Sequence, residues 1–407
     1  MDTHTILAIV FILGMGLFLY VRRSALTVQK ILGPIIYFAM YRASWGLGAM
    51  DALANWFPRF MRWLFYSGIV IGFLGMGFIS YEIIKNTVNL FTQPELAPGI
   101  QPVLPIAVKG VFYVPFAYWI ISIFVIAAIH EFAHGVAARA HNIPVKSSGF
   151  AFLGIILPVI PAAFVEPDEK KLIKRPMRQQ LSVFAAGPLA NILLAFLVIF
   201  VFGFQFPGIA PETSSKIALV DLPSFADGLT QWNGLTLTGV TPGSPAAAAG
   251  LIPGETITAI DDVPVTDRAK LVERLNTIKP QDAITLTTKD NVRPLVVGSN
   301  PDDASRPWIG IQFDAQSGPT PSALARYGER GTTLILGGIT LLVFIYALSL
   351  GIGLFNLLPL GPLDGGRMFQ LAAERILGPS TGHAAWKYMG FFFLGLIILN
   401  LTIGFVR

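Results

Sequence analysis

Three residues suited to metal binding and proton transfer occur within one short segment of the chain. His130 and His134 are four residues apart, and Glu131 directly follows the first histidine. At about 100° per residue, an α-helix places the two imidazoles about 40° apart on one face, where both can bind a single Zn²⁺ ion. Glu131 lies next to that face, near enough to accept a proton from a water molecule that zinc activates for attack on a carbonyl group.

The position of this segment favours a metal site over a chance match. His130 follows a run without Asp, Glu, Lys or Arg, residues 110–129, that is long enough for a membrane-spanning helix. An ionisable side chain at membrane depth costs roughly 2.5–3.5 kcal/mol on insertion scales, so such groups usually have a function. We therefore interpret the two histidines as metal ligands.

Zinc usually has four ligands, so two histidines and a water molecule leave one ligand to be supplied by the protein. On a continuous helix His141 would lie about two turns beyond His134, too far along the axis to share the ion. Glu166 lies at a basic loop, beyond two prolines. Asp364 is the better candidate because it ends an uncharged run, 331–363, in a segment broken by prolines and glycines. Irregular backbone at membrane depth is tolerated only where it is buried in protein or lines a wet cavity.

The composition predicts a polytopic α-helical membrane protein. Of 407 residues, 53% are hydrophobic and 13% are charged, against roughly 25% charged in a soluble domain. The chain has no Cys, so any metal must be bound by His and carboxylates. Because a span needs about 20 apolar residues, we predict at least six transmembrane helices, the first of them retained rather than cleaved. The uncharged runs are 3–21, 63–81, 110–129, 147–165, 179–211, 331–363 and 388–406.

The basic residues indicate a lipid bilayer rather than a nucleic acid as the partner surface. Net charge is +5, but the positive side chains form short clusters beside the apolar runs, which is the positive-inside pattern. If the clusters are cytoplasmic, the metal lies nearer the cytoplasmic side of a multi-pass protein. The clusters are Arg22, Arg23 and Lys30; Arg59 and Arg62; Arg139 and Lys146; and Lys170, Lys171, Lys174, Arg175 and Arg178.

Charged residues return between residues 213 and 318, where short Val/Ile/Thr/Leu runs alternate with turns. This predicts a soluble, strand-rich domain inserted between two membrane halves, on the extracytoplasmic side. Residues 239–260 read strand, short Ala-rich helix, strand, and their order of Gly, Ser-Pro, Gly-Leu and Pro-Gly-Glu resembles an α/β PDZ domain. PDZ domains bind extended peptides as an added strand. The candidate peptide-carboxylate loop, Gly234–Leu237, lacks the second glycine, so a spacer or steric gate is an equally good interpretation.

Taken together, the motifs resemble those of the site-2 proteases, which are polytopic intramembrane zinc proteases. The H-E-x-x-H motif of that family matches His130–His134, and its glycine-proline-asparagine element matches residues 186–191. With the inserted domain, the resemblance covers about residues 115–406. The Asn-Pro-Asp-Gly region of the family matches Asn356, Pro359, Asp364 and Gly365.

The resemblance implies a role for each residue of the site. His130, His134 and Asp364 would bind Zn²⁺, Glu131 would be the catalytic acid and base, and Asn356 would donate a hydrogen bond to the substrate or the oxyanion. The implied activity is regulated intramembrane proteolysis, in which the transmembrane segment of a single-pass membrane protein is cleaved after an upstream protease has acted first.

The resemblance also implies a re-entrant hairpin at residues 147–165, beside the active site, with a short span as the alternative. We expect its edge, at residues 152–156, to pair with unwound substrate. Residues 31–62 favour an interfacial amphipathic segment. The chain then divides into an N-terminal membrane region (1–110), a membrane core with the metal-binding helix and hairpin (111–212), a PDZ-like domain (213–318) and a C-terminal membrane region with the third ligand (319–407).

Two other functions are compatible with these residues. A membrane-anchored zincin would act on soluble segments, but it requires the metal-binding helix to lie in water, which the uncharged flank argues against. A non-proteolytic membrane zinc protein, such as a transporter or an inactive adaptor, would keep the ligands without needing a general base. Glu131 distinguishes this last class from an enzyme.

Overall fold

The computed structural model describes residues 3–32, 36–93, 99–106, 108, 111–155, 157–203, 219–300 and 303–406. The chain forms two compact units. The membrane unit contains the chain up to residue 201 and from residue 340 onward, and the inserted unit contains residues 219–339. The predicted boundaries at residues 110 and 212 lie outside the described residues.

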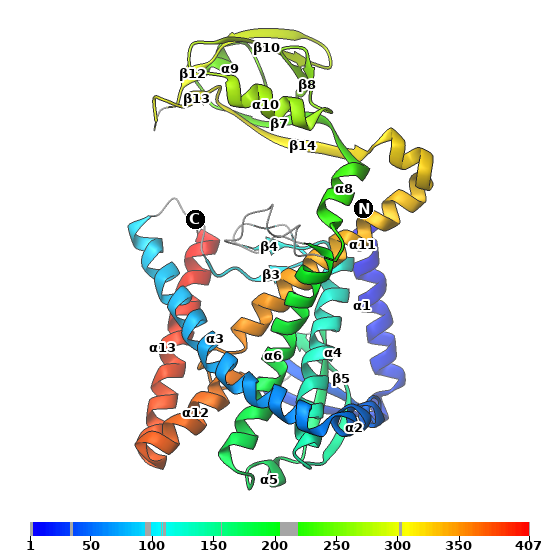
Figure 1. The fold of residues 1–407 in the computed structure, drawn as a ribbon, viewed down its shortest axis with the longest axis vertical. Helices are drawn as coiled ribbons and strands as arrows, with labels where there is room; N and C mark the ends of the chain where they lie inside the picture. Colours follow the sequence, from blue (N-terminus) through cyan, green and yellow to red (C-terminus); the bar gives the residue numbers. More distant parts are fainter. Residues whose placement is uncertain are drawn as a thin grey trace. The chain divides into compact units, whose positions relative to one another are not determined.

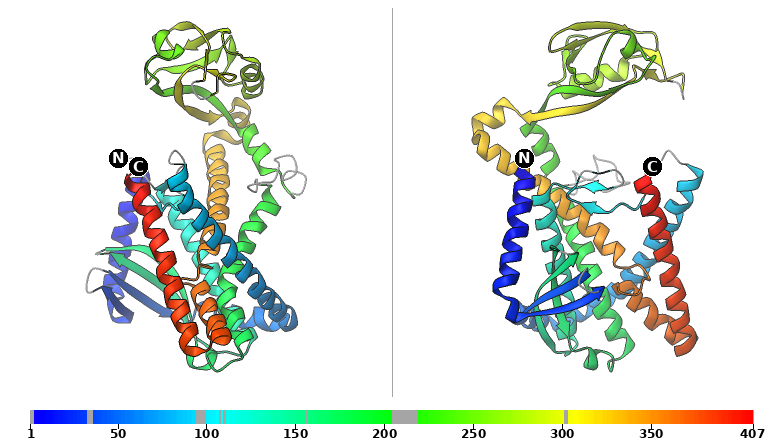
Figure 2. Two further views of the ribbon diagram at one scale, coloured as in Figure 1. Left: turned by 90° about the vertical axis from the view of Figure 1, so that its left-hand side faces the viewer. Right: turned by 180° about the vertical axis from the view of Figure 1, so that it is seen from behind.

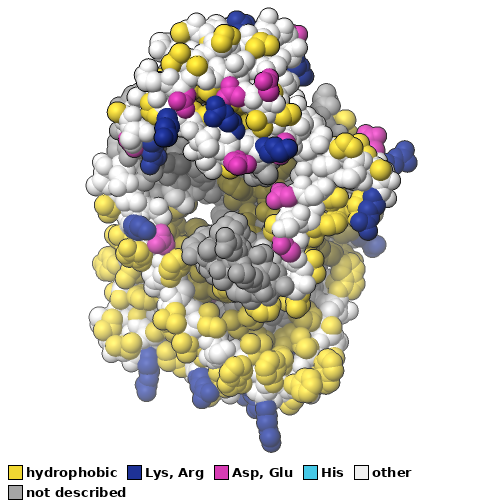
Figure 3. All heavy atoms as spheres, turned by 45° about the horizontal axis from the view of Figure 1, so that its top comes forward, with side chains coloured by type: hydrophobic (Ala, Val, Ile, Leu, Met, Phe, Trp, Pro, Cys, Tyr) yellow, Lys and Arg dark blue, Asp and Glu magenta, His cyan; other side chains and the backbone are white. Residues whose placement is uncertain are grey.

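Five helices in the described part of the chain are long and apolar enough to cross a membrane. A shorter apolar helix, α1 (Thr3–Val21), precedes them (Figure 1). Large apolar side chains such as Leu74 and Leu197 are exposed on the long helices. Figure 3 shows a belt of hydrophobic side chains on the surface. These features agree with the predicted polytopic helical membrane protein. The five helices are α3 (Pro58–Thr92), α4 (Phe116–Ala140), α6 (Met177–Phe202), α11 (Pro321–Phe355) and α13 (Pro379–Val406).

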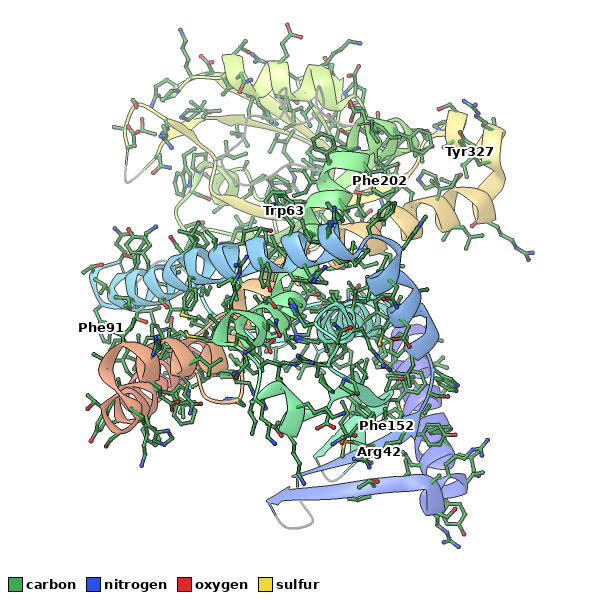
Figure 4. All side chains as sticks on the ribbon, turned by 60° about the horizontal axis from the view of Figure 1, so that its bottom comes forward. Arg42, Trp63, Phe91, Phe152, Phe202 and Tyr327 are labelled. Atoms are coloured by element: carbon green, nitrogen blue, oxygen red, sulfur yellow. The ribbon has the colours of Figure 1, made fainter. Side chains whose placement is uncertain are left out.

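The segment predicted as a hairpin is an antiparallel pair of strands, β5 (Val145–Ile155) and β6 (Leu157–Pro167), and not a short helical span. Pro158 and Pro161 lie on β6, which is an edge strand, where the missing N–H of proline is tolerated. The hairpin completes a sheet of order β1-β2-β5-β6. Figure 4 shows Arg42 and Phe152 on its two inner strands.

The strand pairing shows that the free edge of this sheet does not lie at residues 152–155, where we predicted it. Strand β5 pairs with β2 on one side and β6 on the other, so residues 152–155 belong to an inner strand. Residue 156 lies outside the described residues. The edge on this side of the sheet therefore belongs to β6.

The N-terminal segment before α3 contains both strands and a short helix. It forms strands β1 (Leu26–Leu32) and β2 (Ile36–Ala43) and the short helix α2 (Leu47–Trp56) before α3 begins at Pro58. A place for residues 31–62 at the membrane interface stays a prediction, and within that segment strand β2 is held by cross-strand pairing with β5. Such long-range pairing overrides local amphipathic periodicity.

Helix α11 ends at Phe355, and the chain stays irregular until α12 (Asp364–Leu377) begins. The amide of Gly365 donates to the carbonyl oxygen of Asn356 at 2.8 Å. A Cβ on Gly365 would clash with the backbone of Leu357, so only glycine allows the first turn of α12 to pack this closely. Leu357 is fully buried, so its side chain packs closely within the membrane unit. These contacts hold Asp364 in the first turn of α12.

The inserted unit has a mixed arrangement of strands and short helices. The segment predicted as strand, short helix, strand is confirmed by β7 (Thr230–Val240), α9 (Pro245–Ala248) and β8 (Thr256–Ile260). The main sheet has the order β11-β10-β8-β7-β14, with β9 paired to β8. The other elements of the inserted unit are α8 (Leu222–Leu229), β9 (Val263–Pro264), α10 (Arg268–Thr277), β10 (Ala283–Thr288), β11 (Val292–Val296) and β14 (Ile311–Pro319).

Four short strands, the short helix α5 and the 3-10 helix η1 (Arg23–Ala25) complete the described elements. Strands β3 (Val103–Leu104) and β4 (Phe112–Tyr113) pair in the membrane unit, and β12 (Gly298–Ser299) and β13 (Pro307–Trp308) pair in the inserted unit. Helix α5 (Glu169–Leu172) links β6 to α6, so the hairpin leads back into the helices of the membrane unit (Figure 2).

His141, directly after α4, is held as a buried neutral side chain. It is 4% exposed, and its Nε2 lies 2.7 Å from the Ser182 hydroxyl on α6. Burial lowers the pKa of His141 from 6.5 to about 4, together with the positive charges of Arg62, Arg175 and Arg178. Its part in the structure is therefore to join α4 to α6.

We expect the free energy of unfolding to fall as the pH falls from about 6.5 to about 4. In this range the unfolded chain binds a proton at His141 that the folded chain does not bind, so acid favours unfolding. His141→Gln should weaken this pH dependence while its amide still donates to Ser182. Thermal unfolding of both proteins in detergent at about pH 7 and about pH 4.5 measures the effect, and equal losses of stability would contradict it.

Candidate metal centre

Two helices distant in sequence bring the predicted ligands together. His130 and His134 lie on α4 with their Nε2 atoms 3.2 Å apart. Asp364 Oδ2, from the start of α12, lies 3.1 Å from His130 Nε2 and 3.4 Å from His134 Nε2. Three potential ligand atoms from residues separated by more than 200 positions thus form a nearly equilateral triangle.

The spacing of this triangle fits a tetrahedral zinc ion. Ligand atoms about 2.0–2.1 Å from such an ion lie roughly 3.3 Å from one another, close to the three distances found here. Within the described ranges, these residues are the only group of three or more His, Cys, Asp or Glu side chains placed to hold a metal. Two imidazoles and one carboxylate also match the ligand chemistry of catalytic zinc sites, which leave the fourth position open.

Helix α6 determines how His134 presents its ring. The Nδ1 atom of His134 lies 2.7 Å from the backbone carbonyl oxygen of Val183. A carbonyl oxygen only accepts, so Nδ1 carries the proton and donates it. The lone pair of Nε2 is then directed at the ligand triangle, as metal binding requires.

Gly187 leaves the space in which the two rings meet. A Cβ built on this residue would clash with the Nε2 atoms of both His130 and His134. Any larger residue would therefore occupy the region where a metal has to lie. Close packing between α4 and α6 and access of a metal to the histidines both depend on this glycine.

Glu131 faces the same cleft as the ligands. One of its carboxylate oxygens accepts a hydrogen bond from the backbone N–H of Val165 on β6, at 3.0 Å. The cleft has a volume of about 320 Å³, and its lining includes Glu131, His134, Asp364 and Val165. The cleft thus places a carboxylate beside the ligand group, with the edge of the hairpin sheet along one side.

Two residues weighed as ligands lie outside the group. His141 is bonded to Ser182, and Glu166 is paired with Arg42 at 3.3 Å. The hydroxyl of Ser147, which donates to Glu166, lowers the pKa of that carboxyl, and the Arg42 guanidinium lowers it further. Glu166 lines the cleft with Glu131 but stays an ionised side chain with partners of its own.

Asn356 and Asn191 have different surroundings. Asn356 follows α11, and its backbone carbonyl accepts from Gly365. In the described part of the chain its side chain has no contact with the ligand triangle, so its role as a hydrogen-bond donor to substrate stays a prediction. Asn191, on α6, contacts His130 directly: its Nδ2 lies 3.1 Å from His130 Nδ1. In the sequence it stands out only as the asparagine of the glycine-proline-asparagine element, residues 186–191.

Comparison with known proteins gives one family and several distant relatives. Residues 118–397 match the family "Peptidase family M50", a range that includes α4, α6, α12 and the whole ligand group. An uncharacterized protein of Methanocaldococcus jannaschii is 25% identical over 378 residues, which is 92% of this chain and 87% of that protein. Zinc metalloprotease RasP of Shouchella clausii is 23% identical over 292 residues, which is 59% of this chain and 62% of RasP.

Two further similarities are with a second RasP and with a solved structure. The protein named regulator of sigma-W protease RasP, from Bacillus subtilis, is 22% identical over 285 residues, which is 58% of this chain and 61% of that protein. The crystal structure of the PDZ domain of an SdrC-like protein from Listeria monocytogenes has a TM-score of 0.18 and 21% identity, and the match covers 20% of this chain and 88% of that one.

Gly187→Ala is expected to abolish tight metal binding, because the added methyl group projects between the two imidazole nitrogens. The matched control is Gly77→Ala on α3, where a Cβ meets no other atom within 4 Å. Metal content of the two purified variants, measured beside the wild type, tests the expectation. Full metal content in Gly187→Ala would show that the ligand group lies elsewhere.

Proposed function

The chain belongs to peptidase family M50, the site-2 protease family, and is a metalloprotease; from this premise we propose that it uses zinc to cleave transmembrane segments of single-pass membrane proteins. The observation that carries the proposal is the ligand triangle of His130, His134 and Asp364, with Glu131 in the same cleft and on a helix apolar enough to span a membrane. Peptide hydrolysis needs water, and this polar cleft can admit it within an otherwise apolar unit.

In the proposed mechanism the side chains have separate tasks. His130, His134 and Asp364 would hold the zinc, which would polarise a carbonyl group and lower the pKa of water toward about 7. Glu131 accepts the proton of the attacking water and delivers it to the leaving amine. The N–H of Val165 keeps the Glu131 carboxylate in place at 3.0 Å. Asn356 is the proposed hydrogen-bond donor to the substrate.

Glu131→Gln should abolish cleavage of a helical membrane peptide while zinc stays bound, since the amide keeps the shape of the side chain but cannot accept the proton. Losses for a general base are typically 10²–10⁴-fold. The measurement pairs a cleavage assay with metal analysis, and Asp364→Ala serves as the variant that should lose zinc. Normal cleavage by Glu131→Gln would instead favour a non-proteolytic membrane zinc protein.

The free edge of β6 supports a second part of the proposal, that unwound substrate pairs with this strand. A peptide bond in an intact helix is shielded, and its backbone groups need new partners once the helix opens. Because the N–H of Val165 points to Glu131 rather than to β5, the N–H of Ala163, two residues earlier, also points away from β5. An added strand would therefore lie along the cleft.

Ala163→Pro removes one outward N–H without removing a bond to β5. We expect about tenfold slower cleavage with zinc content unchanged, the effect of losing one backbone hydrogen bond to substrate. Ala163→Val is the matched control because it enlarges the side chain but keeps the N–H. Equal rates for the proline variant and the valine variant would argue against strand pairing at this edge.

The charge distribution and one relative support proposals on the membrane sidedness of the protein and on the kind of proteolysis. Basic residues at the ends of α4 and α6 support a metal site nearer the cytoplasm, with the inserted unit on the other side. Labelling of a single cysteine introduced at Lys171 would test this, since the chain has no other cysteine. One relative is named regulator of sigma-W protease, which supports a role in regulated proteolysis. Prior cleavage of the substrate by an upstream protease is part of the proposal.

A further inference from the structure

Asn191 is held tightly between three helices of the membrane unit. Its side chain is on α6, one turn after Gly187, and the residue is fully buried. The hydroxyl of Ser349, on α11, donates to its backbone oxygen at 2.8 Å. A Cβ on Gly353 would come within 3.0 Å of the Asn191 Cβ, so α11 packs directly against it. The amide therefore has a fixed position beside His130 of α4.

The contact between Asn191 and His130 restricts which nitrogen of the imidazole carries the proton. The Nε2 atom of His130 faces the ligand triangle, so metal binding requires a neutral ring with its proton on Nδ1. A protonated Nδ1 needs an acceptor, and the residue 3.1 Å away is Asn191. An imidazole that binds a metal generally donates its other N–H to such a partner.

The oxygen of the Asn191 amide is available for this role. Oδ1 is buried and has no hydrogen-bond partner in the described part of the chain. The Oδ1 and Nδ2 atoms of an asparagine are told apart by their hydrogen-bond partners. A 180° rotation of the amide group puts Oδ1 where Nδ2 was. With that orientation, Oδ1 accepts the Nδ1–H of His130.

We propose that Asn191 is a positioning residue of the metal centre: its Oδ1 accepts from His130 Nδ1–H and so holds the ring in the tautomer and orientation that bind zinc. The inference rests on the proposed function, because it assumes that the triangle holds a metal. In this role Asn191 acts through His130 and not by contact with the substrate. His134 has the equivalent partner in the carbonyl of Val183.

The test is the zinc affinity of the full-length protein in detergent, measured by competition with a chromogenic chelator. Asn191→Leu keeps the branched shape of the side chain but removes the acceptor, and we expect zinc to bind about 10–100-fold more weakly. Asn191→Asp should restore the affinity, because a carboxylate also accepts from Nδ1–H. A role in packing alone would not be rescued in this way.

The matched control is Asn400→Leu on α13. Asn400 is also fully buried, its Nδ2 donates to Thr87 at 2.7 Å, and its Oδ1 likewise has no partner in the described residues. This variant should keep the zinc affinity of the wild type within about twofold. If Asn191→Leu fails to fold, Asn191→Ser serves instead, since its shorter side chain does not reach His130 and should give the same loss.

The outcomes separate the inference from the proposed function. If the wild type binds no zinc, or His130→Ala binds it as well as the wild type, the proposed function fails. If His130→Ala loses zinc but the Asn191 variants bind it normally, only the inference fails. It also fails if Asn191→Asp binds as weakly as Asn191→Leu, or if Asn400→Leu gives the same loss.

Discussion

The structure depends on bringing three polar ligand atoms to within 3.4 Å of one another inside a unit built of apolar helices. Buried ionisable groups are tolerated when they are paired or coordinate a metal. Here each group has its place determined by a neighbouring element: His134 by a carbonyl on α6, and Asp364 by the close packing of Gly365 against the unwound segment before α12. Gly187 then provides the room in which the rings and the carboxylate meet.

The second requirement is water, without which a peptide bond cannot be hydrolysed. The cleft beside the ligands is bordered by Glu131 and by the edge strand β6, so the proposed base and the strand proposed to pair with peptide lie at the same cleft. The contact between the N–H of Val165 and Glu131 links the sheet to the chemistry directly. In this arrangement the hairpin serves the site by its backbone, which explains how a segment of low polarity can still line a catalytic cleft.

Three of the relatives are only 22–25% identical to the chain. At that distance most apolar positions can be exchanged among lipid-facing residues with little effect, because any large apolar side chain is suitable there. Residues that bind a metal, transfer a proton or allow two helices to approach closely have few replacements. The family was therefore recognisable from a few short motifs, although the sequence as a whole has diverged.

Local pattern and composition alone determined the spans, the placement of His130 and His134 on one helix face, the helix break before Asp364 and the strand–helix–strand of the inserted unit. These features depend on spacing, on hydrophobic periodicity, and on proline and glycine, all of which are readable within a few residues. Tertiary structure decided that Asp364 meets histidines 230 and 234 positions away, that β6 rather than β5 has the free edge, and that Asn191 contacts His130. It also decided that residues 36–43 of the predicted interfacial segment form a strand. Each of these depends on which distant segments pack or pair together, and that is settled by the shapes of whole helices and by competition among strands, neither of which a local pattern records.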